Sequence, residues 1–321
     1  MGNRTCWLVR VQEQEKLKIL KRVLGDCYSK SDENLFYCPK CDHHKKKLSI
    51  NITKNVFKCW VCDWSGKNIY RIIRQYGTPD QRYTWKSFAS ELEIENFNHK
   101  LFNQEESIIA DDVKLPKEFM TLTGKNLSST SLRPLNYLKS RGLTNNDIIK
   151  WKIGYCASGE YGGRIIIPSF NLLGEINYFV ARSYDQDWKK YSNPNISKNI
   201  IFNHPYVDFD EDVILVEGVF DAIKAGDNSV PLLGSTLSEN SNLFYEIVKN
   251  DTPVYLGLDP DALKKTNKLI KLFLKYDIET YLIDVAPFGD VGEMSCNEFL
   301  SRKLSASVLN TDNYLLSRIK G

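Results

Sequence analysis

The stretch Val213-Ile-Leu-Val-Glu217-Gly-Val-Phe-Asp221 indicates the fold of this 321-residue chain most clearly. Its four consecutive apolar residues predict a buried strand, and a helix is expected to begin shortly after it. Strands and helices then alternate, with further strands at 230–233, 254–258 and 280–285 and helices at 220–225, 242–249 and 264–276. Because parallel strands need crossover connections, this alternation predicts an α/β unit over 212–300 with helices on the faces of a parallel sheet.

Carboxylates follow three of the predicted strands. They are Glu217, Asp259, Asp261, Asp290 and Glu293. The carboxyl ends of parallel strands meet at one edge of a sheet, so these acids are expected to gather there. Hard oxygen ligands suit magnesium or manganese, and two such ions commonly act together in phosphoryl transfer. We therefore predict two or more catalytic Mg²⁺ or Mn²⁺ ions. Asp221 either joins this cluster or forms hydrogen bonds within its turn, and the sequence leaves both interpretations open.

Four of the eight cysteines form two close pairs, Cys38-Pro-Lys-Cys41 and Cys59-Trp-Val-Cys62. Pairs of this spacing, separated here by 17 residues, are typical of a tetrahedral zinc site. The intervening residues predict a hairpin with strands at 48–52 and 56–58 and a turn near Lys54-Asn55. We therefore predict a zinc ribbon with one structural Zn²⁺. Disulfides or a redox pair are weaker alternatives, as is a ligand role for His43 or His44.

Charge is unevenly distributed along the chain, whose net charge is +3. Residues 1–86 carry 18 Lys and Arg against 8 Asp and Glu, whereas residues 87–321 carry 25 against 32. The ribbon contains a basic run at residues 45–47 and three aromatic residues, Phe57, Trp60 and Trp64. Basic side chains follow a phosphate backbone and aromatic rings stack on unpaired bases, so this module is expected to contact nucleic acid. A solvated charged face with rings packed in a small core is the alternative.

Periodicity and polarity assign the other segments. Residues 1–35 show a helical spacing of apolar residues. Between residues 116 and 211, helices are predicted at 132–141 and 144–151, the second capped by Thr144, and strands at 164–168 and 176–180. The overall class is therefore α+β. The expected divisions are a zinc-ribbon module (1–76), a polar linker with some helix (77–115), a mixed subdomain (116–211), the parallel-sheet unit (212–300) and a C-terminal helical tail (301–321).

Several of these segments resemble a known family. Val216-Glu-Gly-Val-Phe-Asp-Ala222, Leu258-Asp-Pro-Asp261 and Gly289-Asp290 are similar to the motifs of a TOPRIM domain. Five other segments resemble the basic subdomain of DnaG-type primases. They are Arg141-Gly-Leu143, Ile153-Gly-Tyr155, Arg164-Ile-Ile-Ile-Pro168, Ala181-Arg182 and Lys190-Tyr-Ser-Asn-Pro194. The ribbon precedes both in the same order as in that family. The chain is thus identified as a DnaG-type TOPRIM DNA primase, most similar to compact bacteriophage primases with a four-Cys ribbon.

The resemblance implies an activity and the residues for it. A primase is a DNA-directed RNA polymerase, a nucleotidyltransferase that makes short RNA primers from ribonucleoside triphosphates on single-stranded DNA during replication. Glu217, Asp259 and Asp261 would be catalytic and, with Asp290, would hold the metal ions. Nucleotide or template would be bound by Arg164, Arg182, Lys190 and Asn193. The ribbon would recognise the template sequence. The chain has no G-x-x-x-x-G-K-[ST] loop. The resemblance alone implies a separate replicative helicase as a partner.

The chain departs from the family pattern in two places. DnaG-type bacterial enzymes usually have a His among the zinc ligands, and the family often has Pro and a further Asp where this chain has Val291-Gly-Glu293. Two other classes share some of the motifs: a non-catalytic zinc and TOPRIM scaffold for DNA repair, and a TOPRIM nuclease. Neither is expected to carry the pattern of Arg164, Arg182 and Lys190. Without a membrane-length apolar run or a secretory signal, the protein is expected in the cytoplasm, that of the host if viral.

Overall fold

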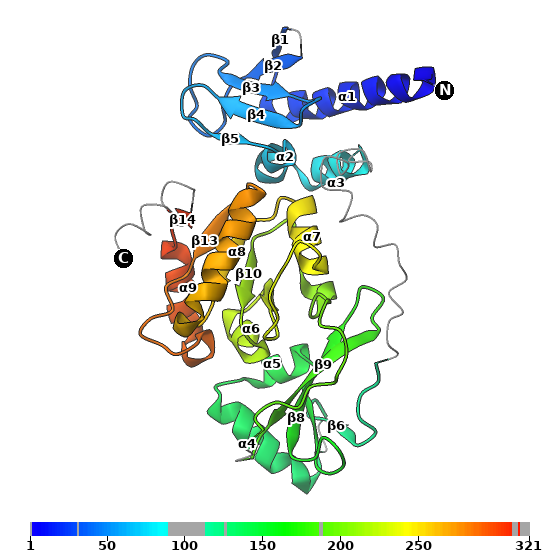
Figure 1. The fold of residues 1–321 in the computed structure, drawn as a ribbon, viewed down its shortest axis with the longest axis vertical. Coiled ribbons are helices and arrows are strands. Elements are labelled where there is room, and N and C mark those ends of the chain that lie inside the picture. Colours follow the sequence, from blue (N-terminus) through cyan, green and yellow to red (C-terminus); the bar gives the residue numbers. More distant parts are fainter. Residues whose placement is uncertain are drawn as a thin grey trace. The chain divides into compact units, whose positions relative to one another are not determined.

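A computed structural model describes residues 2–30, 32–88, 113–124, 127–185, 189–309 and 314, with the backbone alone for residues 2–11 and 88. The chain divides into two compact units (Figure 1). Unit 1 comprises residues 1–104 together with the short segment 249–251, and unit 2 comprises residues 105–248 and 252–321.

Unit 1 contains an antiparallel sheet in the order β1-β2-β3-β4-β5. Its strands are β1 (Tyr28–Lys30), β2 (Glu33–Phe36), β3 (Leu48–Asn51), β4 (Val56–Cys59) and β5 (Ser65–Gly66). The helices of the unit are α1 (Gly2–Leu24), α2 (Tyr70–Tyr76) and α3 (Pro79–Phe88). All three helices and the sheet contribute to one core, in which Leu20, Ile50, Ile72 and Trp85 are at most 1% exposed. The predicted hairpin at 48–58 is thus part of a larger sheet.

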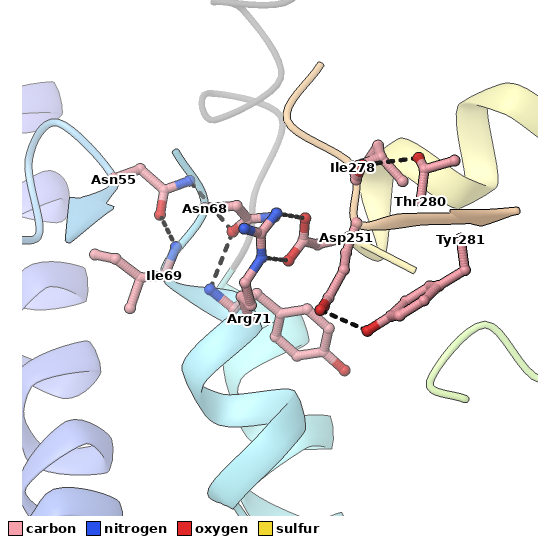
Figure 2. A network of polar contacts seen from close by, with 10 residues as sticks. Asn55, Asn68, Ile69, Arg71, Asp251, Ile278, Thr280 and Tyr281 are labelled. Carbon is pink, nitrogen blue, oxygen red and sulfur yellow. Dashed lines mark hydrogen bonds and ion pairs between the residues drawn. The ribbon is translucent and has the colours of Figure 1, made fainter. Parts of the chain in front are cut away.

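Side-chain hydrogen bonds fix the start of α2 (Figure 2). The Oδ1 atoms of Asn55 and Asn68 accept from the backbone N–H groups of Ile69 and Tyr70, at 2.9 and 3.0 Å. These bonds satisfy amides that a helix N-terminus leaves without an intrahelical partner. In the first turn, Arg71 donates from Nε and Nη2 to the carboxylate of Asp251 at 2.9 and 3.0 Å. Both side chains are buried, and removing one partner of such a pair typically costs about 3–5 kcal/mol.

Unit 2 is built around two sheets (Figure 1). The first is antiparallel, in the order β6 (Phe119–Thr121), β7 (Gly154–Cys156), β8 (Arg164–Phe170) and β9 (Ile176–Ser183). The second has the order β11-β10-β12-β13-β14, and β10 to β13 are parallel to one another. Its strands are β10 (Val213–Val216), β11 (Ser229–Pro231), β12 (Val254–Gly257), β13 (Thr280–Leu282) and β14 (Val308–Leu309).

One hydrophobic core joins the two sheets of unit 2. Ile165 and Ile167 of β8, Val216 of β10 and Leu138 of α4 are all fully buried in it. The helices of this unit are α4 (Leu132–Ser140), α5 (Asn145–Lys150), α6 (Val219–Ala225), α7 (Asn242–Lys249), α8 (Leu263–Lys275) and α9 (Cys296–Ser305). Thr144 caps α5 as predicted: its hydroxyl accepts from the N–H of Asp147 at 3.2 Å. Because β8, β9 and β10 all contribute buried residues to this core, they are held together in one frame.

The structure confirms the predicted α+β class, with an N-terminal four-cysteine region and a parallel sheet. It differs from the expected helical pattern over residues 1–35. Helix α1 ends at Leu24, and Gly25 follows with φ +82°, a backbone conformation that favours glycine. The chain then forms β1 and β2, which pair with each other and, through β2, with β3.

The expected linker with some helix and the expected helical tail can each be compared in part with the structure. Helix α3 lies within the expected linker 77–115, and its Trp85 is buried in the core of unit 1; residues 89–112 lie outside the described residues. The described start of the expected helical tail contains the end of α9 and then β14, which pairs with the edge of β13; residues 310–313 and 315–321 lie outside the described residues. Backbone groups at that edge need partners, which explains why a strand forms there. The limits of the predicted domains stay a prediction.

Candidate zinc centre and acidic site

The four predicted cysteine ligands meet at one point of unit 1. The Sγ atoms of Cys38 and Cys62 are 3.8 Å apart, as are those of Cys41 and Cys59, and all four lie within 4.8 Å of one another. A tetrahedral zinc ion with Zn–S bonds of about 2.3 Å has S–S edges of about 3.8 Å. The donor set therefore fits one zinc ion. We call the two Cys-x-x-Cys turns, at residues 38–42 and 59–63, the first and second zinc knuckles. In each knuckle the residue after the second cysteine, Asp42 or Asp63, has a left-handed backbone conformation.

The pKa values of two of the four thiols are shifted in opposite directions. Burial raises the pKa of Cys38 to about 12, whereas the amides of Cys62 and Val61 outweigh burial and lower the pKa of Cys59 to about 7. Only thiolates ligate zinc, so binding of the ion would release the protons that burial retains. The nearby His43 is engaged elsewhere: its Nδ1 accepts from the N–H of Lys45 at 3.2 Å.

The aromatic residues of the ribbon have different roles. Phe57 and Trp64 are 3% and 8% exposed and pack in the core, so the alternative of rings packed in a small core holds for these two. Trp60, in the second knuckle, is 65% exposed, and Nζ of Lys58 lies 5.1 Å from its ring centre. Tyr37, which sequence reasoning missed, is 47% exposed beneath Lys46. In each of these two pairs, a lysine lies over an exposed aromatic ring.

The predicted acids lie at the carboxyl edge of the parallel sheet in unit 2. Glu217 directly follows β10, Asp259 and Asp261 follow β12, and Asp290 follows β13 at the start of a short 3-10 turn. Strands β10 and β12 are neighbours, with Val216 paired to Gly257, so their ends place Glu217 beside the loop that holds Asp259. The topology therefore brings the four predicted ligands to one edge.

Electrostatics show that these carboxylates act on one another. Burial, and then the charges of Asp221, Glu217, Asp290 and Asp261, raise the pKa of Asp259 to about 7. Burial and the charge of Asp290 raise the pKa of Asp221 to about 6. Oε1 of Glu217 and Oδ1 of Asp259 are buried without a hydrogen-bond partner in the described part of the chain. Buried oxygens of this kind are costly unless a donor or a cation satisfies them.

Asp221 forms hydrogen bonds, as one of the two interpretations expected, and its membership of a metal-binding cluster stays a prediction. Its Oδ2 accepts from the N–H of Gly218 at 2.9 Å, which caps α6, and its Oδ1 accepts from the N–H of Gly292 at 3.0 Å. Its charge also contributes to the raised pKa of Asp259, so it belongs to the cluster electrostatically. Oε2 of Glu293 accepts from the N–H of Gly289, the residue before Asp290, at 2.8 Å.

A lysine that the sequence did not reveal contacts the cluster. Nζ of Lys265, in the first turn of α8, donates to Oε2 of Glu217 at 2.7 Å. The side chains of Lys265 and Glu217 are 19% and 21% exposed. Helix α8 carries several lysines at nearby positions, and nothing in their spacing says which one turns toward the acids.

The predicted basic residues occupy β8, β9 and the segment after them. Arg164 is 7% exposed and donates from Nη1 to the carbonyl of Lys189 at 3.0 Å. Oδ1 of Asn193 accepts from the N–H of Ala181 at 3.0 Å, so these two residues hold the 189–193 segment against the sheet. Lys190 is exposed. The guanidinium of Arg182 lies 4.7 Å from the ring centre of Tyr191, and its Nε is buried without a hydrogen-bond partner among the described residues.

Tyr191 connects the basic residues with the acids. Burial and the negative charge of Asp221 raise the pKa of its hydroxyl, and the positive charge of Arg182 opposes this. Its ring is nevertheless 40% exposed. The charges of Arg182, on β9, and of Asp221, on α6, therefore both act on Tyr191. Carboxylates can hold divalent cations, and cations can bind a phosphate-bearing ligand.

The structure thus defines an α+β protein with a zinc-binding ribbon and an acidic edge on a parallel sheet. No family model matches the chain. Its sequence is 24% identical over 205 residues to the DNA primase of Thermotoga maritima. The matched region covers 50% of this chain and 36% of that protein. The chain is therefore related to DNA primase, and it spans about a third of the length of that relative.

Solved primase structures are also similar to the chain. One is the structure of the zinc-binding and RNA polymerase domains of the Aquifex aeolicus primase. The superposition covers 94% of this chain and 86% of that structure's chain, with 18% identity and a TM-score of 0.48. A DnaG primase catalytic domain bound to single-stranded DNA covers 56% and 74%, with 16% identity and a TM-score of 0.49. The E. coli primase catalytic core covers 57% and 75%, with 15% identity and a TM-score of 0.47. These likenesses are weak, and the relationship stands on the sequence match.

None of the helices in the described parts of the chain is both long enough and apolar enough to cross a membrane.

Proposed function

We propose that this protein is a DNA primase, a nucleotidyltransferase that makes short RNA primers from ribonucleoside triphosphates on a single-stranded DNA template. The observation that carries the proposal is the gathering of Glu217, Asp259, Asp261 and Asp290 at one sheet edge, beside cations of the same unit. The sequence relationship to DNA primase selects this activity among the metal-dependent reactions of phosphates.

The oxygen donors of the acids suit magnesium or manganese, and among the described residues only the four cysteines converge closely enough to surround an ion in the structure as it stands. All the predicted ligands are hard oxygens, and Glu217 and Asp259 each present a buried oxygen that lacks a hydrogen-bond partner among the described residues. Bound there, such ions would supply the positive charge that binds the triphosphate and offsets charge developing at the α-phosphate. Asp221 would keep its hydrogen bond at the start of α6, and its negative charge would act on Asp259.

The reaction forms a bond between the 3′ hydroxyl oxygen of the growing primer and the α-phosphorus of the incoming nucleotide. The bond from that phosphorus to the pyrophosphate oxygen breaks, and the hydroxyl proton is lost. Glu217 would hold a metal ion or take this proton. Arg182 and exposed Lys190 would bind the phosphates, while Arg164 and Asn193 would hold the segment that carries Lys190. Their common frame would keep the reactants in place.

The zinc ribbon would recognise the template. Exposed Trp60 with Lys58, and Tyr37 with Lys46, would stack on bases and neutralise phosphates of single-stranded DNA. We also propose a separate helicase partner, which the family resemblance implies, and a location in the cytoplasm.

The test is a priming assay with labelled ribonucleotides, single-stranded DNA of varied sequence, and Mg²⁺ or Mn²⁺. Glu217→Gln should lower the yield of short RNA at least about 100-fold, because even outer-shell partners of a metal contribute up to that much. The matched control is Glu279→Gln, whose carboxylate lies at the opposite end of the sheet and accepts from Tyr281 at 2.8 Å. The control should prime like the parent.

Other products would overturn the proposal. Cut DNA without new RNA would indicate a nuclease, and DNA binding without any product would indicate a scaffold. Equal RNA yield from Glu217→Gln and the parent would remove Glu217 from the reaction. Circular dichroism and zinc content should be unchanged in both variants, so that a lost fold is not mistaken for lost chemistry.

A further inference from the structure

Lys265 binds one oxygen of Glu217 and leaves the other without a partner. The Nζ–Oε2 distance is 2.7 Å, while Oε1 is buried and lacks a hydrogen-bond partner among the described residues. Oδ1 of Asp259 is likewise buried and lacks a hydrogen-bond partner among the described residues. The strands before these two acids, β10 and β12, are adjacent and parallel. The two unpartnered oxygens therefore come from neighbouring strand ends, on the edge where the acids gather.

A carboxylate can turn about its last bond, so a partner on one oxygen decides which oxygen is presented to a ligand. Hydrogen-bond partners behind metal ligands commonly have this effect, and their loss typically weakens metal binding about 10- to 100-fold. Lys265 is well placed for it, because its side chain is only 19% exposed and begins in the first turn of α8. Its neighbour Lys264 is exposed and offers a matched comparison on the same turn.

We propose that Lys265 is a positioning residue: by holding Oε2 of Glu217, it leaves Oε1 free to bind a divalent cation next to Asp259. This inference rests on the proposed function and adds a residue to its site. A lysine that acted only as a neighbouring positive charge would have the opposite effect, since its removal would make the cluster more negative and cation binding tighter. The direction of the change in affinity therefore separates the two roles.

The experiment measures Mn²⁺ binding to the zinc-loaded protein, without DNA or nucleotide, by the electron paramagnetic resonance signal of free Mn²⁺. Asp259→Asn identifies which bound Mn²⁺ belongs to the acidic edge. Lys265→Met should raise the Kd of that site about tenfold. Lys265→Arg, which keeps a donor, should stay within about threefold of the parent, and Lys264→Met should not change the Kd.

A double-mutant cycle tests whether Lys265 acts through Glu217. In a Glu217→Gln background, Lys265→Met should weaken Mn²⁺ binding further by less than about twofold, because the carboxylate to be positioned is gone. An equal loss in both backgrounds, or unchanged or tighter binding by Lys265→Met alone, would overturn the inference while leaving the primase proposal intact. A parent protein that binds no Mn²⁺ at the acidic edge would overturn both the inference and the metal assignment.

Discussion

Asp259 shows how strongly neighbouring groups act on a single residue. Burial and four nearby carboxylates raise its pKa from an ordinary value of 3.8 to about 7. The folded protein therefore binds a proton at this group more tightly than the unfolded chain does. Between about pH 4 and pH 7 the folded state holds more protons, so the free energy of unfolding falls as the pH rises through this window. Ionised Asp259 is a source of instability that a bound cation would relieve.

Asp259→Asn should stabilise the protein at neutral pH in buffer without Mg²⁺ or Mn²⁺. Because one pKa unit corresponds to about 1.4 kcal/mol, and the neighbouring acids relax in part, we expect a gain of roughly 1–3 kcal/mol in free energy of unfolding at pH 8. The gain should shrink toward pH 4, where the parent carboxyl is protonated. Urea unfolding at several pH values measures this. Added Mn²⁺ should stabilise the parent and leave the variant unchanged.

Glu279→Gln is the control for this pH dependence. Its carboxylate directly precedes β13 and so lies at the amino-terminal ends of the parallel strands, away from the acids. Its stability relative to the parent should not vary systematically between pH 4 and pH 8. A destabilised Asp259→Asn at pH 8 would show that the carboxylate is stabilised by a partner, against the electrostatics described above.

Local elements with their own sequence signals were predictable, and elements that depend on distant partners were not. The hairpin of β3 and β4, the Thr144 cap and helix α7 follow from alternation, capping chemistry and periodicity. Strands β1, β2 and β14 have two to four residues each, and β1 is exposed throughout, so periodicity cannot reveal them. They form because neighbouring strand edges need partners.

The same distinction applies to the candidate site. The acids were predictable because parallel strands bring their carboxyl ends to one edge, a rule that needs only element order. Lys265 was not, because the choice among the lysines of α8 depends on the rotation of that helix against β10. In the ribbon, spacing identified the cysteines, but only the packed core shows that Phe57 and Trp64 are buried.

The second zinc knuckle carries the element-scale prediction for DNA binding. Trp60→Ala should weaken binding of a single-stranded oligonucleotide about tenfold, since stacking on one base contributes about 1–3 kcal/mol. Fluorescence anisotropy at fixed salt measures the Kd. Tyr83→Ala, which removes a ring 78% exposed on α3 of the same unit, is the control and should bind like the parent. Equal effects of both substitutions would mean that aromatic exposure alone, and not the knuckle, determines binding.

At the scale of the whole molecule, the two units have different sources of stability. Unit 2 has an extensive core that joins its sheets, whereas the core of unit 1 surrounds a ribbon with four thiols clustered at its end. Small modules seldom bury enough apolar surface to be stable alone, and a structural zinc ion can contribute about 10 kcal/mol or more to folding. Loss of zinc should therefore affect unit 1 far more than unit 2.

Replacing Cys38 and Cys41 together by Ser should thus separate template recognition from the acidic site. We expect the variant to lose its zinc and one of two unfolding transitions in calorimetry, because two thiolates cannot hold the ion in a tetrahedral site. Mn²⁺ binding at the acidic edge should stay within about twofold of the parent, since its residues belong to the separate core of unit 2. Primer synthesis should fall with DNA affinity. Cys296→Ser, at an exposed thiol of unit 2, is the control and should change none of these. Simultaneous loss of Mn²⁺ binding and of both transitions would show instead that the units fold as one cooperative body, with zinc supporting the acidic site as well.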